Sequence, residues 1–157
     1  FLHGVSGMVI DSTYDEFIIR YSYLYSSAGT AELRMQLANN GGGTFTNASS
    51  VNAQEQTTSG WTALSAATHY RLTPSFNPTP TTYAASGIVT ISRIVGVSTS
   101  QAFISSIATA TTGVSVAQAM GIDVLSGTTA QFTGIRLLFN TGNFANNGRI
   151  KLYGRKA

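Results

Sequence analysis

The sequence lacks cysteine and is poor in histidine, proline and charged residues. Without cysteine there is no disulfide framework and no thiolate metal site. Two histidines, His3 and His69, are too few to build a zinc site on their own. We therefore expect neither a metal nor another cofactor. No apolar run approaches the ~20 residues that span a bilayer, so membrane insertion is not expected.

Charged residues make up only 10% of the chain, against about 25% in an average globular protein. Serine, threonine, asparagine, glutamine and glycine supply the polarity instead. Hydroxyl and amide side chains suit a surface that packs on copies of itself better than charged side chains do. The composition therefore indicates a subunit with extensive interfaces. The alternative is a Ser/Thr-rich β protein without such interfaces.

The few charges are unevenly distributed, because no acidic residue follows Asp123. Five cations do follow it: Arg136, Arg149, Lys151, Arg155 and Lys156. A basic tail suits an anionic surface such as lipopolysaccharide or an acidic capsule. The alternative is a solvated strand face and a frayed terminus. Nucleic-acid binding is not expected, because no helix or loop concentrates basic residues with interleaved aromatics.

Two segments near the N-terminus have the pattern of β-strands. Residues 31–38 alternate polar side chains with apolar ones, which predicts a strand with one buried face: Ala31, Leu33, Met35 and Leu37. Residues 16–25 are rich in aromatic and β-branched side chains, which fit a pleated surface. In that segment Phe17, Ile19, Tyr21 and Tyr23 share a face. A turn at 26–30 predicts that the two strands pair as an antiparallel hairpin.

Further strands are expected at 68–73, 87–95, 101–109, 131–139 and 149–153. Residues 113–122 also permit a helix, but the threonines and valines around them favour a strand. Residues 44–60 are expected to form a long surface loop with room for one short strand. Pro74, Pro78 and Pro80 mark an irregular crossing that cannot join a central ladder.

These segments give roughly eight to ten short strands and no convincing helix, which predicts an all-β fold. We expect an antiparallel two-sheet β-sandwich, jelly-roll-like. Residues 1–157 have a natural size for a single β-sandwich domain. Because the chain begins at Phe1, we expect it to be the C-terminal fragment of a longer protein.

The last quarter of the chain predicts two strands joined by a loop rich in glycine and asparagine. Their apolar rows are expected to face the same core: Ile135, Leu137 and Phe139 in the first strand, and Ile150 and Leu152 in the second. Arg136 then shares the outer face with Arg149 and Lys151. Like charges on neighbouring strands repel, at a cost of about a few tenths of a kcal/mol per close pair. Either the long side chains splay into water or an anionic partner lies there.

The same stretch carries a resemblance to a known family. The pattern from Ile135 to Gly154, Ile-Arg-Leu-x-Phe-x-x-Gly-Asn-Phe-Ala-x-x-Gly-x-Ile-x-Leu-Tyr-Gly, resembles the C-terminal end of tail-fibre and receptor-binding proteins of tailed bacteriophages. Three earlier segments resemble the opening of the same kind of domain: Tyr14-Asp-Glu-Phe-Ile-Ile-Arg-Tyr, Ala31-Glu-Leu-Arg-Met-Gln-Leu and Asn40-Gly-Gly-Gly-Thr-Phe. Asn40 stands where the family often has Asp, which disfavours a metal at that loop.

The resemblance implies a β-sandwich head that forms a homotrimer at the distal tip of a tail fibre or spike of the virion. Such a head attaches the virion to a bacterial surface polysaccharide or an outer-membrane protein. Two alternatives remain open. One is a structural virion jelly roll, in a baseplate or as a capsid decoration, that never touches the host. The other is a secreted lectin or polysaccharide hydrolase domain.

No constellation of catalytic residues is visible in the sequence. Hydrolysis of a polysaccharide needs two carboxyl groups about 5–10 Å apart. Asp15 and Glu16 are adjacent in a strand and point to opposite faces. Glu32 lies on an outward face and Glu55 in the predicted loop. There is also no Gly-x-Ser-x-Gly elbow for a serine nucleophile. We therefore expect no catalytic residue and no enzymatic activity.

Carbohydrate binding requires an exposed aromatic face beside hydrogen-bonding side chains. The expected receptor-binding residues are Trp61, Tyr70, Arg71 and Tyr83, together with the basic Arg136, Arg149 and Lys151. Other roles remain open for three residues of this region: Trp61 in a core or a subunit contact, Tyr70 against a neighbouring subunit, and His69 as a structural histidine.

Overall fold

The computed structural model describes the side chains of residues 6, 10, 13–38, 45, 69–73, 84–92, 133–145 and 148–156, and the strand backbone at 51–57, 60–64, 93–95, 100–110 and 115–125. All the regular elements among these residues are β-strands. The strands are β1 (Glu16–Leu24), β2 (Leu33–Ala38), β3 (Val51–Thr57), β4 (Gly60–Leu64), β5 (Tyr70–Arg71), β6 (Ala85–Val95), β7 (Ser100–Ala110), β8 (Ser115–Leu125), β9 (Gly134–Phe139) and β10 (Arg149–Arg155).

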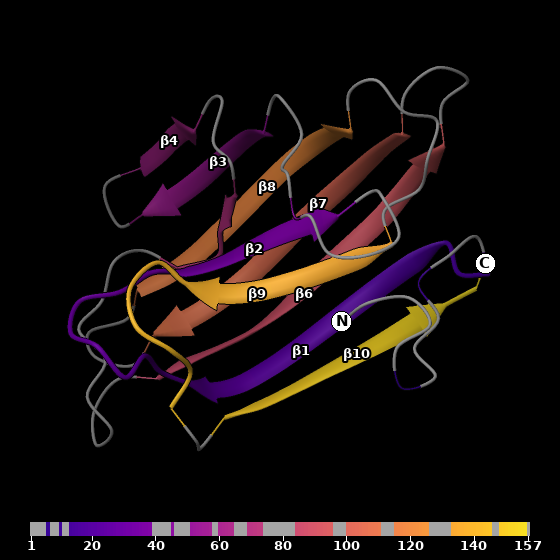
Figure 1. The fold of residues 1–157 in the computed structure, drawn as a ribbon. Coiled ribbons are helices and arrows are strands. Elements are labelled where there is room, and N and C mark those ends of the chain that lie inside the picture. The colour runs from indigo at the N-terminus through magenta and orange to yellow at the C-terminus, as the bar shows by residue number, and fades with distance from the viewer. Residues whose placement is uncertain are drawn as a thin grey trace.

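The strands form two antiparallel sheets. The large sheet has the order β10-β1-β6-β7-β8-β3-β4, and the small sheet has the order β5-β2-β9. The small sheet lies across one face of the large sheet, where β2 and β9 pass in front of it in Figure 1. The predicted all-β architecture with two antiparallel sheets is confirmed. The jelly-roll connectivity and the homotrimer remain predictions.

The hydrophobic core lies between the small sheet and strands β1, β6 and β10. Its buried side chains alternate along each strand, as in Phe17 and Ile19 of β1 or Val89 and Ile91 of β6. Full burial of such a side chain stabilises the fold by about 1.5–3 kcal/mol. The predicted inner rows of β9 and β10 face this one core: Ile135, Leu137 and Phe139 are buried, and Ile150 and Leu152 pack against them.

The predicted hairpin of β1 and β2 is wrong. β1 pairs with β10 and β6 in the large sheet, and β2 pairs with β5 and β9 in the small sheet. Each of the two strands has one apolar face. In separate sheets these faces lie against each other across the core, whereas in a hairpin both would need a third element to cover them.

Tyr23 does not share the inner face of β1, contrary to the prediction. The pairing of β1 with β6 shifts register between Tyr21 and Leu24, and Tyr23 has a φ of 58°. An irregularity of this kind changes which side chain points inward. Leu24 is consequently buried, while Tyr23 is 49% exposed.

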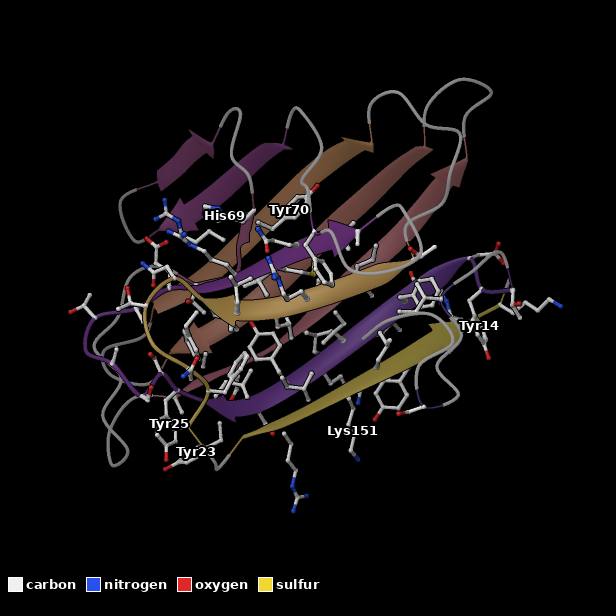
Figure 2. All side chains as sticks on the ribbon, viewed as in Figure 1. Tyr14, Tyr23, Tyr25, His69, Tyr70 and Lys151 are labelled. Carbon is white, nitrogen blue, oxygen red and sulfur yellow. The ribbon has the colours of Figure 1, made fainter. Side chains whose placement is uncertain are left out.

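Two neighbouring connections each carry the chain from one sheet to the other: residues 25–32, between β1 and β2, and residues 140–145, after β9. We call these two connections together the double crossover. The Ser27 N–H donates to the Asn143 carbonyl at 2.8 Å, and the Ala145 N–H donates to the Tyr25 carbonyl at 3.1 Å. Both connections bend at the same end of the sheets in Figure 1, where Figure 2 labels Tyr23 and Tyr25. The β1–β10 pair therefore continues into the β2–β9 pair.

Other strand predictions agree with the structure in part. Of the segment 113–122, residues 115–122 lie in β8 and are a strand, as favoured, and residues 113 and 114 lie outside the described residues. The stretch expected to be mainly loop carries both β3 and the start of β4, so Glu55 lies in a strand. The strand expected at 68–73 is reduced to β5. Asn40 lies outside the described residues.

The Tyr21 hydroxyl is buried and has no hydrogen-bond partner among the described residues. Burial raises the pKa of this phenol above its ordinary value, because the charged form is poorly solvated there. An unpaired buried hydroxyl costs about 1–3 kcal/mol. We therefore expect Tyr21→Phe to raise the free energy of unfolding by about 1 kcal/mol in urea denaturation.

The matched control is Tyr153→Phe, because Tyr153 is 44% exposed, in contrast to the buried Tyr21. We expect this variant to change stability by less than about 0.5 kcal/mol. Destabilisation by Tyr21→Phe would show that the hydroxyl is in fact paired.

Within the described part of the chain, no helix is long and apolar enough to cross a membrane. The described residues also contain no group of three or more histidine, aspartate or glutamate side chains that would hold a metal ion.

Candidate binding surfaces

The predicted outer row of Arg136, Arg149 and Lys151 is not a row. Arg136 lies on β9 in the small sheet, while Arg149 and Lys151 lie on β10 at the edge of the large sheet. The two sheets turn their outer faces in opposite directions. The repulsion expected between these strands is therefore absent.

A different basic surface forms where β10 pairs with β1. Arg20 of β1 is the direct partner of Lys151, and Ser22 is the partner of Arg149. The three cations and Tyr153 are exposed. We call this surface, formed by Arg20, Arg149, Lys151 and Tyr153, the basic face. Figure 2 shows Lys151 projecting from β10 away from the small sheet.

Sequence reasoning missed Arg20 as a member of the basic face. The alternation of β1 contains the signal, because Phe17, Ile19 and Tyr21 point inward and Arg20 must then point outward. What the sequence does not disclose is that β1 pairs with β10, which is the step that sets Arg20 beside Lys151.

The outer face of the small sheet carries a compact ion-pair cluster around Glu32. Arg34 donates to Glu32 Oε2 through Nε at 3.0 Å and Nη2 at 2.7 Å, and Arg71 Nη1 lies 3.7 Å from Glu32 Oε1. The Glu32 side chain is only 15% exposed. One carboxylate therefore compensates two guanidinium groups. Arg71, an expected receptor-binding residue, is half-buried within this cluster.

His69 lies beside the cluster and does not carry an ordinary imidazole pKa. Partial burial lowers its pKa, the positive charges of Arg34 and Arg71 lower it further, and Glu32 acts in the opposite direction. The neutral imidazole is thus favoured. This environment fits the structural role that the sequence left open for His69.

Arg136 forms its own small arrangement on the outer face of β9. Its guanidinium lies 4.5 Å from the centroid of the Phe45 ring, and its Nε donates to Gln36 Oε1 at 2.9 Å. The Gln36 pairing follows from register, since Gln36 is the strand partner of Arg136. Arg136 is accessible, but it is separated from the basic face by the thickness of the sandwich.

The aromatic residues expected to bind a receptor are not brought together in the described part of the structure. Tyr70 is 2% exposed, because its position opposite Met35 directs it into the core. It therefore offers no ring to a ligand at the surface. Trp61 lies in β4, with its side chain outside the described residues, and Tyr83 lies outside them altogether.

Three of the four segments that carry the resemblance to tail-fibre proteins meet in space, while the segment 40–45 lies outside the described residues except for Phe45. β1 pairs with β10, and β2 pairs with β9. Tyr14 of the first segment lies against Gly154 of the last, where a Cβ on Gly154 would approach the Tyr14 ring to 2.6 Å. Figure 2 shows Tyr14 beside the end of β10. The motif pieces from both ends of the chain thus form one structural unit.

Comparison of the chain with protein-family models, with curated proteins and with solved structures found no match.

Proposed function

We propose that this chain is the receptor-binding tip domain of a tailed-bacteriophage tail fibre or spike. In this proposal it is a jelly-roll-like sandwich that assembles as a homotrimer and attaches the virion to a bacterial surface glycan or protein. It acts by binding alone and carries no catalytic residue.

The observation that carries the proposal is the contact between the two ends of the motif. Patterns that match a family by chance have no reason to lie together in space. Here Tyr14, in the first motif segment, lies against Gly154, at the end of the last one. The strands formed by these segments also pair, β1 with β10 and β2 with β9. This supports the interpretation of the separate pieces as one inherited unit.

Composition and surface chemistry add further support. Only 10% of the residues are charged, which suits a chain that packs against copies of itself. Large apolar side chains are exposed at Tyr23 near the end of β1, at Phe144 in the double crossover, and at Ile88 and Tyr153 on the outer face of the large sheet. Such side chains favour contacts with other molecules over a fully solvated surface.

The proposal is tested on the purified chain in two steps. Light scattering at micromolar concentration is expected to give three times the mass of a single chain, because a stable subunit contact buries at least about 1,000 Å². Fluorescently labelled protein is then expected to bind some strains in a panel of capsulated and non-capsulated bacteria, and binding is expected to be lost when the receptor is stripped from the cells.

A stable monomer would contradict the homotrimer. A trimer that binds no strain of a broad panel would instead favour the structural virion protein. Release of reducing ends from capsule would establish the hydrolase, against the expectation of no enzymatic activity.

A further inference from the structure

The basic face gathers three cations that have no carboxylate partner among the described residues, whereas the clusters around Glu32 and Glu16 are compensated. Glu32 pairs with Arg34 and Arg71, and Glu16 Oε2 lies 2.8 Å from Arg155 Nε. Among the described residues no carboxylate pairs with Arg20, Arg149 or Lys151.

Strand register makes this arrangement unfavourable in the isolated chain. Arg20 and Lys151 are direct partners, and directly opposed side chains have Cβ atoms about 5 Å apart. Like charges at that position destabilise a strand pair. Arg149 lies two residues before Lys151 on β10, on the same face of the sheet and roughly 7 Å from Lys151 along the strand. The three cations form a short basic track, not a single charged point.

An aromatic ring lies beside the track. The Arg20 guanidinium carbon is 5.9 Å from the centroid of the Tyr153 ring, and Tyr153 is 44% exposed. Ile88, the partner of Arg20 on β6, is 45% exposed and extends the apolar part of the surface. An exposed ring next to a guanidinium offers a sugar both a stacking surface and a charged hydrogen-bond donor.

We propose that the basic face binds an acidic polysaccharide of the bacterial surface. The carboxylate of one sugar unit lies between Arg20 and Lys151, and the pyranose ring of that sugar packs on the Tyr153 ring. Arg149 binds the carboxylate of the next acidic sugar in the polymer. The polyanion offsets the repulsion between the opposed cations. This assignment rests on the proposed function, since it names the class of glycan that the tip domain would recognise.

A polymer of phosphates would meet the same cations but not the ring. A polyol phosphate chain has no pyranose face for Tyr153, and single-stranded nucleic acid would need several stacking rings to be held well. The combination of a cation pair and one exposed ring therefore favours an acidic sugar.

The test measures binding of the full chain to polygalacturonate by biolayer interferometry at low and moderate salt. Neutral dextran, poly(glycerol phosphate) and single-stranded DNA are the comparison polymers. We expect polygalacturonate to bind best, with an affinity that falls as salt rises, because exposed charges are screened. Dextran is expected not to bind. Equal or tighter binding of either phosphate polymer would overturn the assignment to an acidic sugar.

Two matched lysine substitutions separate the site from bulk charge. Lys151→Gln removes a cation of the basic face, while Lys156→Gln removes an exposed cation that follows β10. We expect Lys151→Gln to weaken binding about 5- to 10-fold, Arg20→Gln with Lys151→Gln at least about 20-fold, and Lys156→Gln less than about 2-fold. Tyr153→Ala is expected to weaken polygalacturonate binding without changing residual binding to poly(glycerol phosphate). Equal losses from Lys151→Gln and Lys156→Gln would overturn the site.

Cell attachment and oligomeric state, measured beside polygalacturonate binding, distinguish the basic-face proposal from the tip-domain proposal. If the chain attaches to bacteria and the Arg20→Gln, Lys151→Gln variant attaches equally well, the basic face is not the site and the tip-domain proposal stands. If polygalacturonate binds through the basic face while the chain is a monomer that attaches to no bacterium, the inference stands and the tip-domain proposal fails.

Discussion

Gly142→Ala is expected to destabilise the chain by about 2–4 kcal/mol, from left-handed backbone strain and a close contact together. Gly142 has a φ of 76°, a conformation that side-chain-bearing residues rarely adopt. A Cβ at this position would lie 2.5 Å from Ser26 Oγ and 2.7 Å from the Ala28 backbone nitrogen. The buried Ser26 hydroxyl donates to the Thr141 carbonyl and accepts from the Ala28 N–H, so it cannot turn away without losing both hydrogen bonds.

The measurement is the free energy of unfolding in urea, with Gly29→Ala as the matched control. Gly29 lies in the same double crossover, and a Cβ there would meet no atom within 4 Å. Its φ also lies outside the left-handed region. We expect Gly29→Ala to change stability by less than about 0.5 kcal/mol. If the two variants behave alike, the double crossover is not the tight joint that the structure describes.

Gly154→Ala is expected to cost about 1–3 kcal/mol, because an added methyl group overpacks a filled contact. The Cβ would approach three atoms of the Tyr14 ring at 2.6–2.7 Å. That ring is held in turn by Phe17, with centroids 5.9 Å apart and planes inclined by 72°. Tyr14 therefore cannot move aside without disturbing the edge of the core.

A double-mutant cycle with Tyr14→Ala shows whether the cost comes from this contact. In the Tyr14→Ala background the methyl group has room, so the added cost of Gly154→Ala is expected to fall below about 0.5 kcal/mol. Additive effects would mean that Gly154 is required for another reason. They would also remove the contact on which the tip-domain proposal depends.

The short-range part of the fold was predictable from the sequence, because strand alternation is a local property. Leu33, Met35 and Leu37 face inward in the structure as their spacing predicts, and so do Ile135 and Leu137. Neither inference required knowing which strand lies next to which.

Strand pairing was not predictable in the same way. The turn residues after β1 permit either a hairpin or a crossing to a second sheet, and the apolar faces of β1 and β2 are compatible with both. The choice is made by β10 and β9, which occupy the pairing edges of β1 and β2. Partners that lie at the far end of the chain leave no local signal.

The candidate site likewise has a part that local sequence predicts and a part that depends on strand pairing. Arg149 and Lys151 were identified from the run of cations in the last segment, and both are exposed. The sequence alone also groups Arg136 with them, because β9 and β10 follow one another along the chain and nothing local shows that they belong to different sheets. Arg20 takes its place beside Lys151 only because distant strands pair, so the composition of the site depends on topology and not on the basic tail alone.

The pairing of β1 with β10 and of β2 with β9 also has a consequence for synthesis of the protein. Both pairs join the beginning of the chain to its end, and closing so large a loop carries an entropic cost before any contact is formed. Contacts of this kind slow folding, and the β2–β9 pair cannot form until β9 has left the ribosome, nor the β1–β10 pair until β10 has. Until then β1 and β2 each keep an edge unpaired, and the nascent chain is most open to aggregation during that interval.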